Sequence, residues 1–354
     1  DFAAGIAVNS LGYHYPGYDE ALKDQIDKLM HISNLYYNEP IIEAGAKLVK
    51  ASKMSKAFFT NSGTEAIEGA LKAAKKYAYV RDGHADHEII AMNHSFHGRS
   101  IGALSVTGTA HYREPFEPLM GGVKFADFND LESVKAQITD KTCAIITEVV
   151  QGEGGIYPAK KEFLEGLRQI CDEKDIMLIF DEIQCGMGRT GHYFAWQAYG
   201  VQPDIMTSAK ALGCGVPVGA FVLSEKAAKA SLEPGDHGTT YGGNPFVCAA
   251  VSKVFDIYEN DKIIEHVQEM TPYLEQKLDE IVAKHECAAT RRGMGFMQGI
   301  VIQGRPVGEV VKAALAKGLL VISAGSDVLR IVPPLVITKE HIDKMAAILD
   351  ECME

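Results

Sequence analysis

The stretch "DIMTSAKALGCG", residues 204–215, places a lysine where a globular protein rarely has one. Residues 205–208 form a short apolar run typical of a buried strand, and Lys210 follows it before a turn containing Gly213 and Gly215. Burial lowers the pKa of an amine, and a neutral amine can form a Schiff base with a carbonyl. The alternative is a lysine that extends to the surface. We expect the glycines to make this turn flexible.

Outward from this stretch, short apolar runs alternate with amphipathic helical patterns between about residues 55 and 225. The predicted strands are 57–60, 88–92, 143–150, 176–180, 205–208 and 220–223, and the predicted helices include 65–79 and 161–174. Buried strands that alternate with helices indicate a mostly parallel sheet.

From about residue 255 the pattern changes to a long helical stretch at 256–284, followed by short strand-like runs at 299–302, 319–322 and 329–332. This pattern predicts a smaller α+β domain. We therefore divide the chain into an N-terminal segment (1–25), a large α/β domain (26–250) and a C-terminal domain (251–354).

Composition excludes several classes of function. The 354 residues include 35 basic and 47 acidic ones, and this net charge of −12 offers no footprint for nucleic acid or anionic lipid. The seven cysteines are odd in number and widely spaced, with no C-x-x-C pair, which favours a reducing compartment over a zinc site or disulfides. No apolar run approaches the ~18 residues of a membrane span, and the start has no basic region of a signal peptide. We expect a cytoplasmic protein.

Functional side chains follow most of the predicted strands. In an open α/β sheet, ligands bind beyond the carboxyl ends of the strands. The sequences that follow the strands are "NSGTEA", "NHSFHGR", "QGEGG", "DEIQ" and "AK". They deliver small residues, an aromatic ring, carboxylates and an amine, which predicts one composite active site.

The helix that follows "NSGTEA" has a start suited to an anion. Ser62 and Glu65 fit the capping box S-x-x-E before an apolar-periodic run. Gly63 permits close backbone approach, and the Ser62 and Thr64 hydroxyls would suit a phosphate at the positive end of the helix. Most capped helices bind nothing, so this feature alone leaves the ligand open.

Asp181 ends the buried run "IMLIFDE", where a carboxylate needs a partner. By itself it could cap a turn or pair with an arginine. Together with Lys210 and the phosphate cradle, it meets the needs of pyridoxal phosphate. The lysine holds the aldehyde, the carboxylate keeps the pyridine nitrogen protonated, and Phe96 could stack on the ring.

Two motifs carry less weight. "GMGRTG", residues 186–191, matches the dinucleotide pattern G-x-G-x-x-G, but five residues separate it from its strand and no clear helix follows. His94 and His97 form H-x-x-H, yet no nearby cysteine or carboxylate completes a metal set, so we expect no metal site.

The segments "NSGTEA", "FHGRS", "QGEGG", "FDEIQCGMGRTG", "PDIMTSAKALGCGVPVGA", "HGTTYGGNP" and "LRIVPPL" occur in an order that resembles the class III, omega-type, pyridoxal-phosphate aminotransferases. The resemblance runs from Asp1 to the C-terminus. It implies fold type I, with a mostly parallel, seven-stranded sheet in the large domain and a smaller α+β domain. Within the family, "DFAAGIAVNSLG", "SNLYYNEP" and "GLLVISAGSDVLRIVPPL" look most like the acetylornithine aminotransferases. Compared with the family, we expect the segment 1–25 to be shortened.

The resemblance implies a homodimer with shared active sites and a role for each matching residue. Lys210 would hold the cofactor and move the substrate proton, Asp181 would pair with the ring nitrogen, and Glu153 would act as a switch. The implied cofactor-binding residues are Ser62, Gly63, Thr64, Phe96, Asp181, Glu182, Ile183, Gln184 and Lys210, together with Thr240, which would reach the phosphate of the neighbouring subunit.

The resemblance also implies how two substrates share one site. Arg99 would bind the far carboxylate of acetylornithine, and Arg330 would bind the α-carboxylate of 2-oxoglutarate as a two-pronged fork. Glu153 would neutralise Arg330 while the ω-amine enters. Thr239 would lie near the substrate. Ile6 stands where ornithine aminotransferases tend to carry a tyrosine, which favours an acylated amine.

The function implied is transfer of the δ-amino group of N2-acetyl-L-ornithine to 2-oxoglutarate by a ping-pong mechanism, as in arginine biosynthesis. Succinylornithine, N-succinyl-diaminopimelate and 4-aminobutyrate aminotransferases are alternatives within the family. An isomerase like glutamate-1-semialdehyde aminomutase shares the fold and the lysine, and a binding protein that has lost catalysis is the third class considered.

Overall fold

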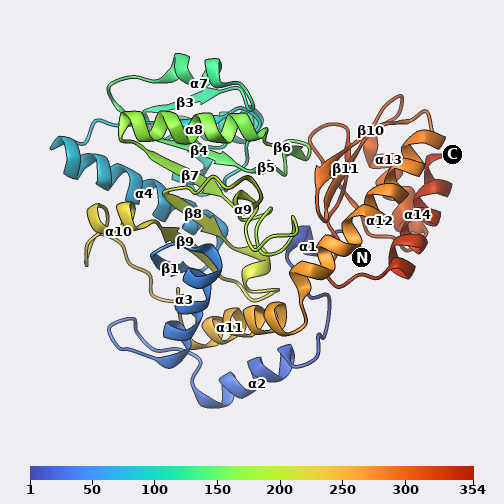
Figure 1. The fold of residues 1–354 in the computed structure, drawn as a ribbon, viewed down its shortest axis with the longest axis horizontal. Helices are drawn as coiled ribbons and strands as arrows, with labels where there is room; N and C mark the ends of the chain where they lie inside the picture. The colour runs from blue at the N-terminus through green and yellow to red at the C-terminus, as the bar shows by residue number, and fades with distance from the viewer.

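The computed structural model describes residues 1–354 and contains a large domain beside a smaller C-terminal domain (Figure 1). A seven-stranded sheet in the order β1-β9-β8-β7-β4-β2-β3 forms the centre of the large domain. Only β9 runs against its neighbours, so the predicted mostly parallel α/β sheet is confirmed. The strands are β1 (Lys56–Thr60), β2 (Glu88–Met92), β3 (Val123–Ala126), β4 (Thr142–Glu148), β7 (Met177–Asp181), β8 (Ile205–Ser208) and β9 (Gly219–Leu223).

Both faces of this sheet are buried. In β2, Ile89 and Ala91 belong to the apolar cluster on the α4 side, whereas Ile90 and Met92 belong to the cluster on the α8 side. Two buried faces explain why these strands read as continuous apolar runs without alternation. The helices that cover these faces include α4 (Gly63–Asp82) on one side and α8 (Lys161–Lys174) on the other. Helix α8 has the predicted bounds.

Most of the remaining elements of the large domain are short. The exceptions are the helices α2, α3 and α11, which lie near the first and last residues of this domain in the sequence. The remaining elements are α1 (Ala4–Ala7), α2 (Tyr18–Lys28), α3 (Glu39–Ser52), α5 (Ile101–Ser105), α6 (Ala110–Arg113), α7 (Leu131–Gln137), α9 (Trp196–Tyr199), α10 (Glu225–Ala230), α11 (Pro245–Asn260), the hairpin β5 (Val150–Gln151) and β6 (Tyr157–Pro158), and 3-10 turns at Glu114–Phe116 and Lys210–Leu212. The predicted strand 143–150 is therefore two strands, β4 and β5. Strand β3 was not predicted, because it lies at the sheet edge and three of its four residues are only half-buried.

The small domain is built on a four-stranded antiparallel sheet in the order β10-β11-β13-β12, packed against three helices. Its elements are α12 (Ile263–Lys284), β10 (Ala288–Met294), β11 (Met297–Ile302), α13 (Val307–Ala316), β12 (Ile322–Ala324), β13 (Val328–Ile331) and α14 (Lys339–Met353). The strand expected at 319–322 begins only at Ile322, because residues 318–321 connect α13 to it.

The packing of helix α11 indicates where the large domain ends. It packs on α2 and α3 of the large domain, whereas α12 packs on β10 and α14. A boundary at 250/251 would cut α11 in two, so we place the division between α11 and α12. The first residues bridge both domains. The Val332 N–H donates to the Phe2 carbonyl at 2.8 Å, and the Leu11 N–H donates to Cys214 Sγ at 3.3 Å.

The "GMGRTG" motif also joins the domains. Arg189 is fully buried, its carbonyl accepts from the Phe296 N–H at 2.8 Å, and its guanidinium donates to the Pro333 carbonyl. Burial lowers the pKa of Arg189 to about 10. At Gly188 a Cβ atom would lie 2.8 Å from Leu335 of the small domain. Gly188 therefore serves close packing between the domains, and nothing in this geometry resembles a dinucleotide cradle.

Candidate active site

A cavity of about 520 Å³ opens at the carboxyl ends of the parallel strands. The structure brings most of the predicted site residues to its wall, because strand ends of one parallel sheet meet at one edge. The predicted residues that line it are Ser62, Gly63, Thr64, Phe96, Arg99, Glu153, Asp181, Ile183, Gln184 and Lys210.

Lys210 begins the 3-10 turn after β8 with a φ of 47°, a backbone conformation that is costly for a residue other than glycine. Burial lowers the pKa of its amine from 10.5 to about 8, and the Glu153 carboxylate opposes this only in part. A Cβ at Gly213 would lie 2.3 Å from the Val216 carbonyl, and Gly215 has a φ of 111°. The glycines therefore permit a close approach and a positive φ that other residues would not, and the flexibility expected of this turn stays a prediction.

Asp181, the last residue of β7, is buried and has three protein partners. Its Oδ2 lies 2.7 Å from Nδ1 of His97, and its Oδ1 accepts from the Ile183 N–H at 3.0 Å and the Thr207 hydroxyl at 3.2 Å. These contacts satisfy the buried carboxylate and hold it at the cavity wall. His97 Nε2 is buried without a protein partner.

His97 is a site residue that the sequence reasoning missed, because it was weighed only as a metal ligand. Its partner in the H-x-x-H pattern, His94, is exposed and lines a separate outer cavity. The signal that could have found His97 was its place after β2, whose carboxyl end lies at the same sheet edge as that of β7.

Glu148 is a second missed carboxyl group. It ends β4 directly opposite Asp181 in the strand register, and it lines the cavity. Its oxygens accept from the Gly152 N–H at 3.1 Å and the Phe96 N–H at 3.3 Å. Burial and the neighbouring Asp181 charge raise the pKa of Glu148 well above its ordinary value. A polar residue inside the apolar run "CAIITEVV" was the available signal.

The start of α4 forms one end of the cavity. The Ser62 hydroxyl accepts from the Glu65 N–H at 3.3 Å, but the Glu65 carboxylate accepts from the Asn61 N–H at 2.7 Å, so the capping box closes one residue early. A Cβ at Gly63 would lie 2.9 Å from Cδ1 of Ile183. The first N–H groups of a helix have no partner within it, and the helix dipole favours an anion there.

The two arginines of the site differ in whether their guanidinium groups form an ion pair. Arg330, on β13, is buried and forms an ion pair with Glu153, with Nη1–Oε1 at 2.5 Å and Nη2–Oε2 at 3.2 Å. Burial raises the pKa of Glu153, but Arg330 more than offsets this and the pKa ends below its ordinary value. Glu153 lines the cavity and Arg330 does not. Arg99 lines it with an exposed guanidinium that forms no ion pair.

These residues fit pyridoxal phosphate. The helix start and the Thr64 hydroxyl suit its phosphate, and the buried, hydrogen-bonded Asp181 suits a protonated ring nitrogen. Lys210 has an amine whose pKa lies near neutrality, which suits an aldehyde. Ile183 and Phe96 supply apolar surface for a flat ring. The family model described as "Aminotransferase class-III" matches residues 1–353.

The chain is a class-III aminotransferase.

Relatives of this class-III aminotransferase match along its whole length. The acetylornithine aminotransferase of Methanocaldococcus jannaschii is 48% identical over 99% of this chain and 88% of the relative. The succinylornithine transaminase of Yersinia pseudotuberculosis is 45% identical over 97% of this chain and 84% of the relative. The ornithine aminotransferase structure of Toxoplasma gondii, described with PLP partly occupying its active site, has a TM-score of 0.95 at 28% identity, covering 100% of this chain and 85% of that one.

The class-III aminotransferase is a pyridoxal-phosphate enzyme. The bound cofactor supplies an aldehyde carbon for the substrate amine and an electron-withdrawing ring. Of the residues that line the cavity, Lys210 would supply an amine that can take and return a proton of the substrate carbon, and Asp181 would supply a carboxylate partner for a ring nitrogen.

Two of the predicted site residues, Glu182 and Ile6, do not line this cavity. Glu182 does not face the cavity: its carboxylate accepts from the Ala195 and Trp196 N–H groups, both at 2.8 Å, and burial raises its pKa to about 7. Successive strand residues point to opposite sides, so only Asp181 enters the site. Ile6 is 45% exposed and also lies off the cavity, whereas Val8 lines it. The contact of Ile6 with the substrate stays a prediction.

Thr239 and Thr240 do not line the cavity of the same chain. Thr239 is half-buried, and its hydroxyl accepts from the Gly242 N–H at 3.0 Å and from Asn61 Nδ2 at 3.4 Å. Thr240 is exposed. Its assignment to the phosphate of a neighbouring subunit stays a prediction.

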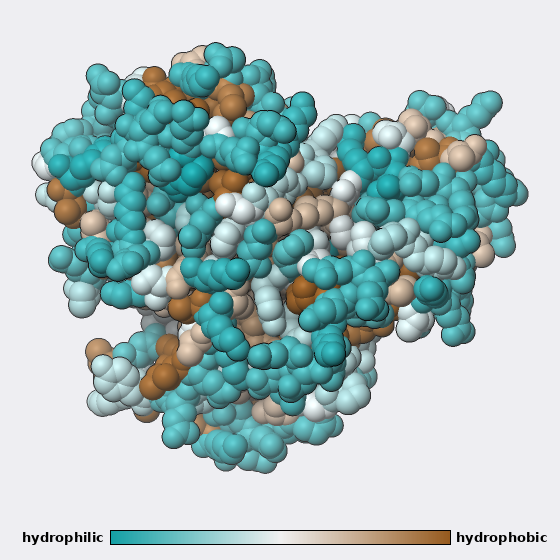
Figure 2. Space-filling view, viewed as in Figure 1, coloured by the Kyte–Doolittle hydropathy of each residue, from teal (hydrophilic) through white to brown (hydrophobic).

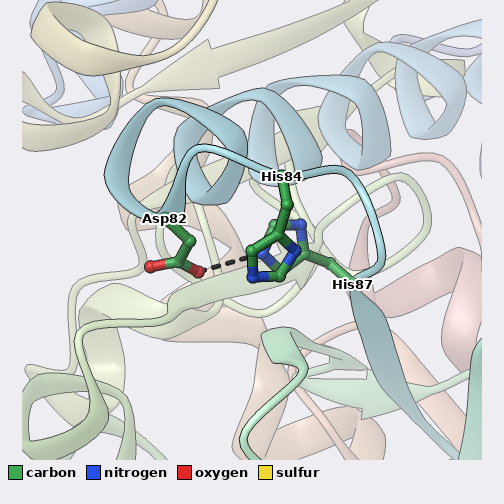
Figure 3. Close-up of side chains that lie close together, drawn as sticks. All are labelled: Asp82, His84 and His87. Atoms are coloured by element: carbon green, nitrogen blue, oxygen red, sulfur yellow. Dashed lines mark hydrogen bonds and ion pairs between the residues drawn. The ribbon is translucent and has the colours of Figure 1, made fainter.

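Three possible metal ligands, Asp82 at the end of α4 and His84 and His87 in the loop before β2, lie close together (Figure 3). His87 Nε2 lies 2.9 Å from Asp82 Oδ2, and the two imidazole rings stack at 4.7 Å. Both oxygens of Asp82 also accept from Arg81 at 2.6 Å. A metal ion would have to compete with this guanidinium, so we assign no metal site here.

Proposed function

We propose that the enzyme transfers the δ-amino group of N2-acetyl-L-ornithine to 2-oxoglutarate, as in arginine biosynthesis. The donor carbon loses one hydrogen and its amine and gains the carbonyl oxygen, giving N-acetyl-L-glutamate 5-semialdehyde. The keto carbon of 2-oxoglutarate undergoes the reverse change and gives L-glutamate. The relative named acetylornithine aminotransferase, at 48% identity, supports this assignment.

The observation that carries the proposal is the contrast between Arg99 and Arg330. Arg330 is neutralised by Glu153 beside Lys210, so a cationic ω-amine can approach Lys210 without meeting a free positive charge. Arg99 lines the same cavity with an unpaired guanidinium, ready for a carboxylate at the far end of the donor. This arrangement suits a donor with an amine at one end and a carboxylate at the other.

The second half-reaction requires the opposite state. 2-Oxoglutarate must bring its α-carboxylate close to Lys210, where Arg330 would receive it as a two-pronged fork. Glu153 must first leave Arg330, and its side chain can do so because it borders the cavity. In both halves the Lys210 amine holds and moves the proton.

Succinylornithine is the alternative donor with specific support, since a succinylornithine transaminase is 45% identical. Both donors present the same ω-amine and the same carboxylate to Arg99. They differ in the charge of the acyl group, and the arrangement of Arg99 and Arg330 does not distinguish the two acyl groups.

The test uses the absorption spectrum of the holoenzyme, recorded before and after N-acetylornithine is added without a keto acid. We expect the cofactor band to convert to that of the aminated cofactor, and 2-oxoglutarate to restore it. A band that ignores N-acetylornithine and responds to succinylornithine would change the substrate and keep the chemistry. A substrate converted with no keto acid would indicate the isomerase instead.

We also propose a cytoplasmic homodimer. The loop between α2 and α3 and its flanks expose an apolar surface made of Leu29, Met30, Leu35, Tyr36, Tyr37 and Ile42, with Tyr37 95% exposed. Apolar side chains gather at this corner in Figure 2, at the lower left. Burying such a patch against a second copy would remove it from water.

All seven cysteines are free thiols, which supports a reducing compartment. None of the helices has the length and apolar character needed to cross a membrane.

Sedimentation of wild type and of Tyr37→Asp separates dimer from monomer. We expect a dimer for the wild type and weakened association for the variant. A monomeric wild type with full activity would contradict shared active sites.

A further inference from the structure

We propose that Tyr112 positions Arg99 and thereby determines affinity for the amino donor, without affecting the keto acid. The inference rests on the proposed function, in which Arg99 binds the far carboxylate of the donor. Tyr112 does not line the cavity of Lys210, and it takes no part in the hydrogen bonds between Glu153 and Arg330. It acts through Arg99 and is therefore a positioning residue.

The Arg99 guanidinium lies against two aromatic rings. Its central carbon is 4.6 Å from the ring centre of Tyr112 and 5.4 Å from that of Phe96. The two rings meet edge to face, with centres 5.7 Å apart and planes at 78°. Such cation–π contacts attract a guanidinium and limit where it can lie.

Nothing else in the protein holds this side chain. Arg99 forms no ion pair, and its hydrogen bond to Thr64 uses only the backbone N–H. A free arginine side chain carries considerable rotamer entropy, which a ligand must overcome to be bound. An acidic partner would fix Arg99 but would compete with the substrate carboxylate. Aromatic rings fix it and leave its charge and its N–H donors available.

Tyr112 is itself well anchored. It lies on α6, directly after a segment tied to the one that carries Phe96. The Gly108 N–H donates to the Ser95 carbonyl at 3.0 Å, and the His97 N–H donates to the Thr107 hydroxyl at 3.0 Å. A Cβ at Gly108 would lie 2.0 Å from the Met92 carbonyl, so the two segments pack with no room between them.

The Tyr112 hydroxyl has no hydrogen-bond partner in the protein. The residue lines an outer cavity of about 780 Å³, which borders the inner cavity at Glu153. The ring, and not the hydroxyl, is the part that contacts Arg99. This separation allows the two parts of the side chain to be tested independently.

The experiment is steady-state kinetics of the holoenzyme with each substrate varied in turn. For Tyr112→Leu, and for Tyr112→Met as a second ring-free variant, we expect the KM for N-acetylornithine to rise about three- to tenfold. The KM for 2-oxoglutarate and kcat should change by less than about twofold. Tyr112→Phe, which keeps the ring, should restore the donor KM. Tyr79→Leu, the same change on an exposed face of α4, is the matched control.

Three outcomes would overturn the inference. Tyr112→Phe as impaired as Tyr112→Leu would assign the effect to the hydroxyl. Equal increases in KM for both substrates would indicate general damage to the site. A wild-type donor KM in Tyr112→Leu, with a raised one in Arg99→Gln, would show that Arg99 needs no aromatic support. If Arg99→Gln also left the donor KM unchanged, the proposed role of Arg99 would fail together with that of Tyr112.

Discussion

Arg330 of the small domain and Glu153 of the large domain meet as a partly buried, two-pronged ion pair at the edge of the Lys210 cavity, with Nη1–Oε1 at 2.5 Å and Nη2–Oε2 at 3.2 Å. Gln184 supports it, because its Oε1 accepts from Arg330 at 3.1 Å. Under the proposed function, the closed pair would leave the site without a free positive charge for an incoming amine, and the opened pair would offer Arg330 to a carboxylate. It also links the position of the small domain to the state of the site.

Glu153→Gln should impair the donor half-reaction selectively. The amide can still accept one hydrogen bond from Arg330 but no longer neutralises it, so a cationic amine meets an uncompensated charge. We expect the single-turnover rate constant with N-acetylornithine to fall tenfold or more, a cost of ~1.4 kcal/mol or greater. The rate with L-glutamate should change much less. Rapid-scan absorption of each half-reaction measures both.

The matched control is Glu340→Gln, an exposed position at the start of α14. It should leave both half-reactions at wild-type rates. Similar losses for both amino donors in Glu153→Gln would mean that Glu153 supports the site as a whole and does not sort the substrates.

The lowered pKa of Lys210 should appear in the stability of the protein freed of its cofactor. Because burial lowers this pKa from 10.5 to about 8, the unfolded chain binds more protons than the folded one between these two pH values. The free energy of unfolding therefore carries a penalty below pH 8 that disappears as pH rises to 10.5. Relative to Lys210→Met, which has no charge to bury, the wild type should gain about 2–3 kcal/mol across this window. Urea unfolding of both proteins at each pH gives the difference. A difference that stays flat from pH 8 to 10.5 would show that the amine is not desolvated.

The sequence predicted which strand-end residues would gather at one cavity, because strand ends of a parallel sheet share one edge. Lys210, Asp181 and Ser62 could be found from local features alone: an apolar run followed by an amine, a carboxylate or a helix cap. His97 was not found because its role depends on a contact with Asp181, 84 residues away in the chain. Such contacts depend on strand order, which hydrophobic patterns do not specify.

The predicted site and the observed cavity differ where side-chain direction matters. Glu182 adjoins Asp181 yet points away from the cavity, and Ile6 sits in a short stretch of positive φ that no sequence pattern revealed. The domain division predicted after residue 250 falls inside α11, because α11 and α12 read as one helical pattern. The pattern continues across Asp261 and Lys262, although the two helices pack in different domains.

Gly63→Ala should weaken binding of pyridoxal phosphate. The new methyl group would lie 2.9 Å from Ile183 Cδ1 and 3.2 Å from its Cγ2, so Ile183 must move toward the space of the ring. Overpacking of this kind costs ~1–3 kcal/mol, which corresponds to a rise in Kd of about fivefold or more.

The double variant Gly63→Ala/Ile183→Val removes Cδ1 and should recover most of the lost affinity. Ile183→Val alone is the control for the missing methyl group. Titration of the apoenzyme with the cofactor, followed by absorption, gives all four dissociation constants. A double variant no better than Gly63→Ala would place the strain elsewhere.

Glu182→Gln should destabilise the fold without weakening cofactor binding. The Glu182 carboxylate accepts from the Ala195 and Trp196 N–H groups, next to the start of α9, and it is completely buried. An amide offers one oxygen for these two donors and brings an NH₂ group that would face one of them. Leaving a buried donor unsatisfied costs ~1–3 kcal/mol. Denaturant unfolding should show this loss, while the Kd for pyridoxal phosphate stays within about twofold of wild type. A large rise in that Kd at unchanged stability would return Glu182 to the cofactor site and reverse the assignment made from its hydrogen bonds.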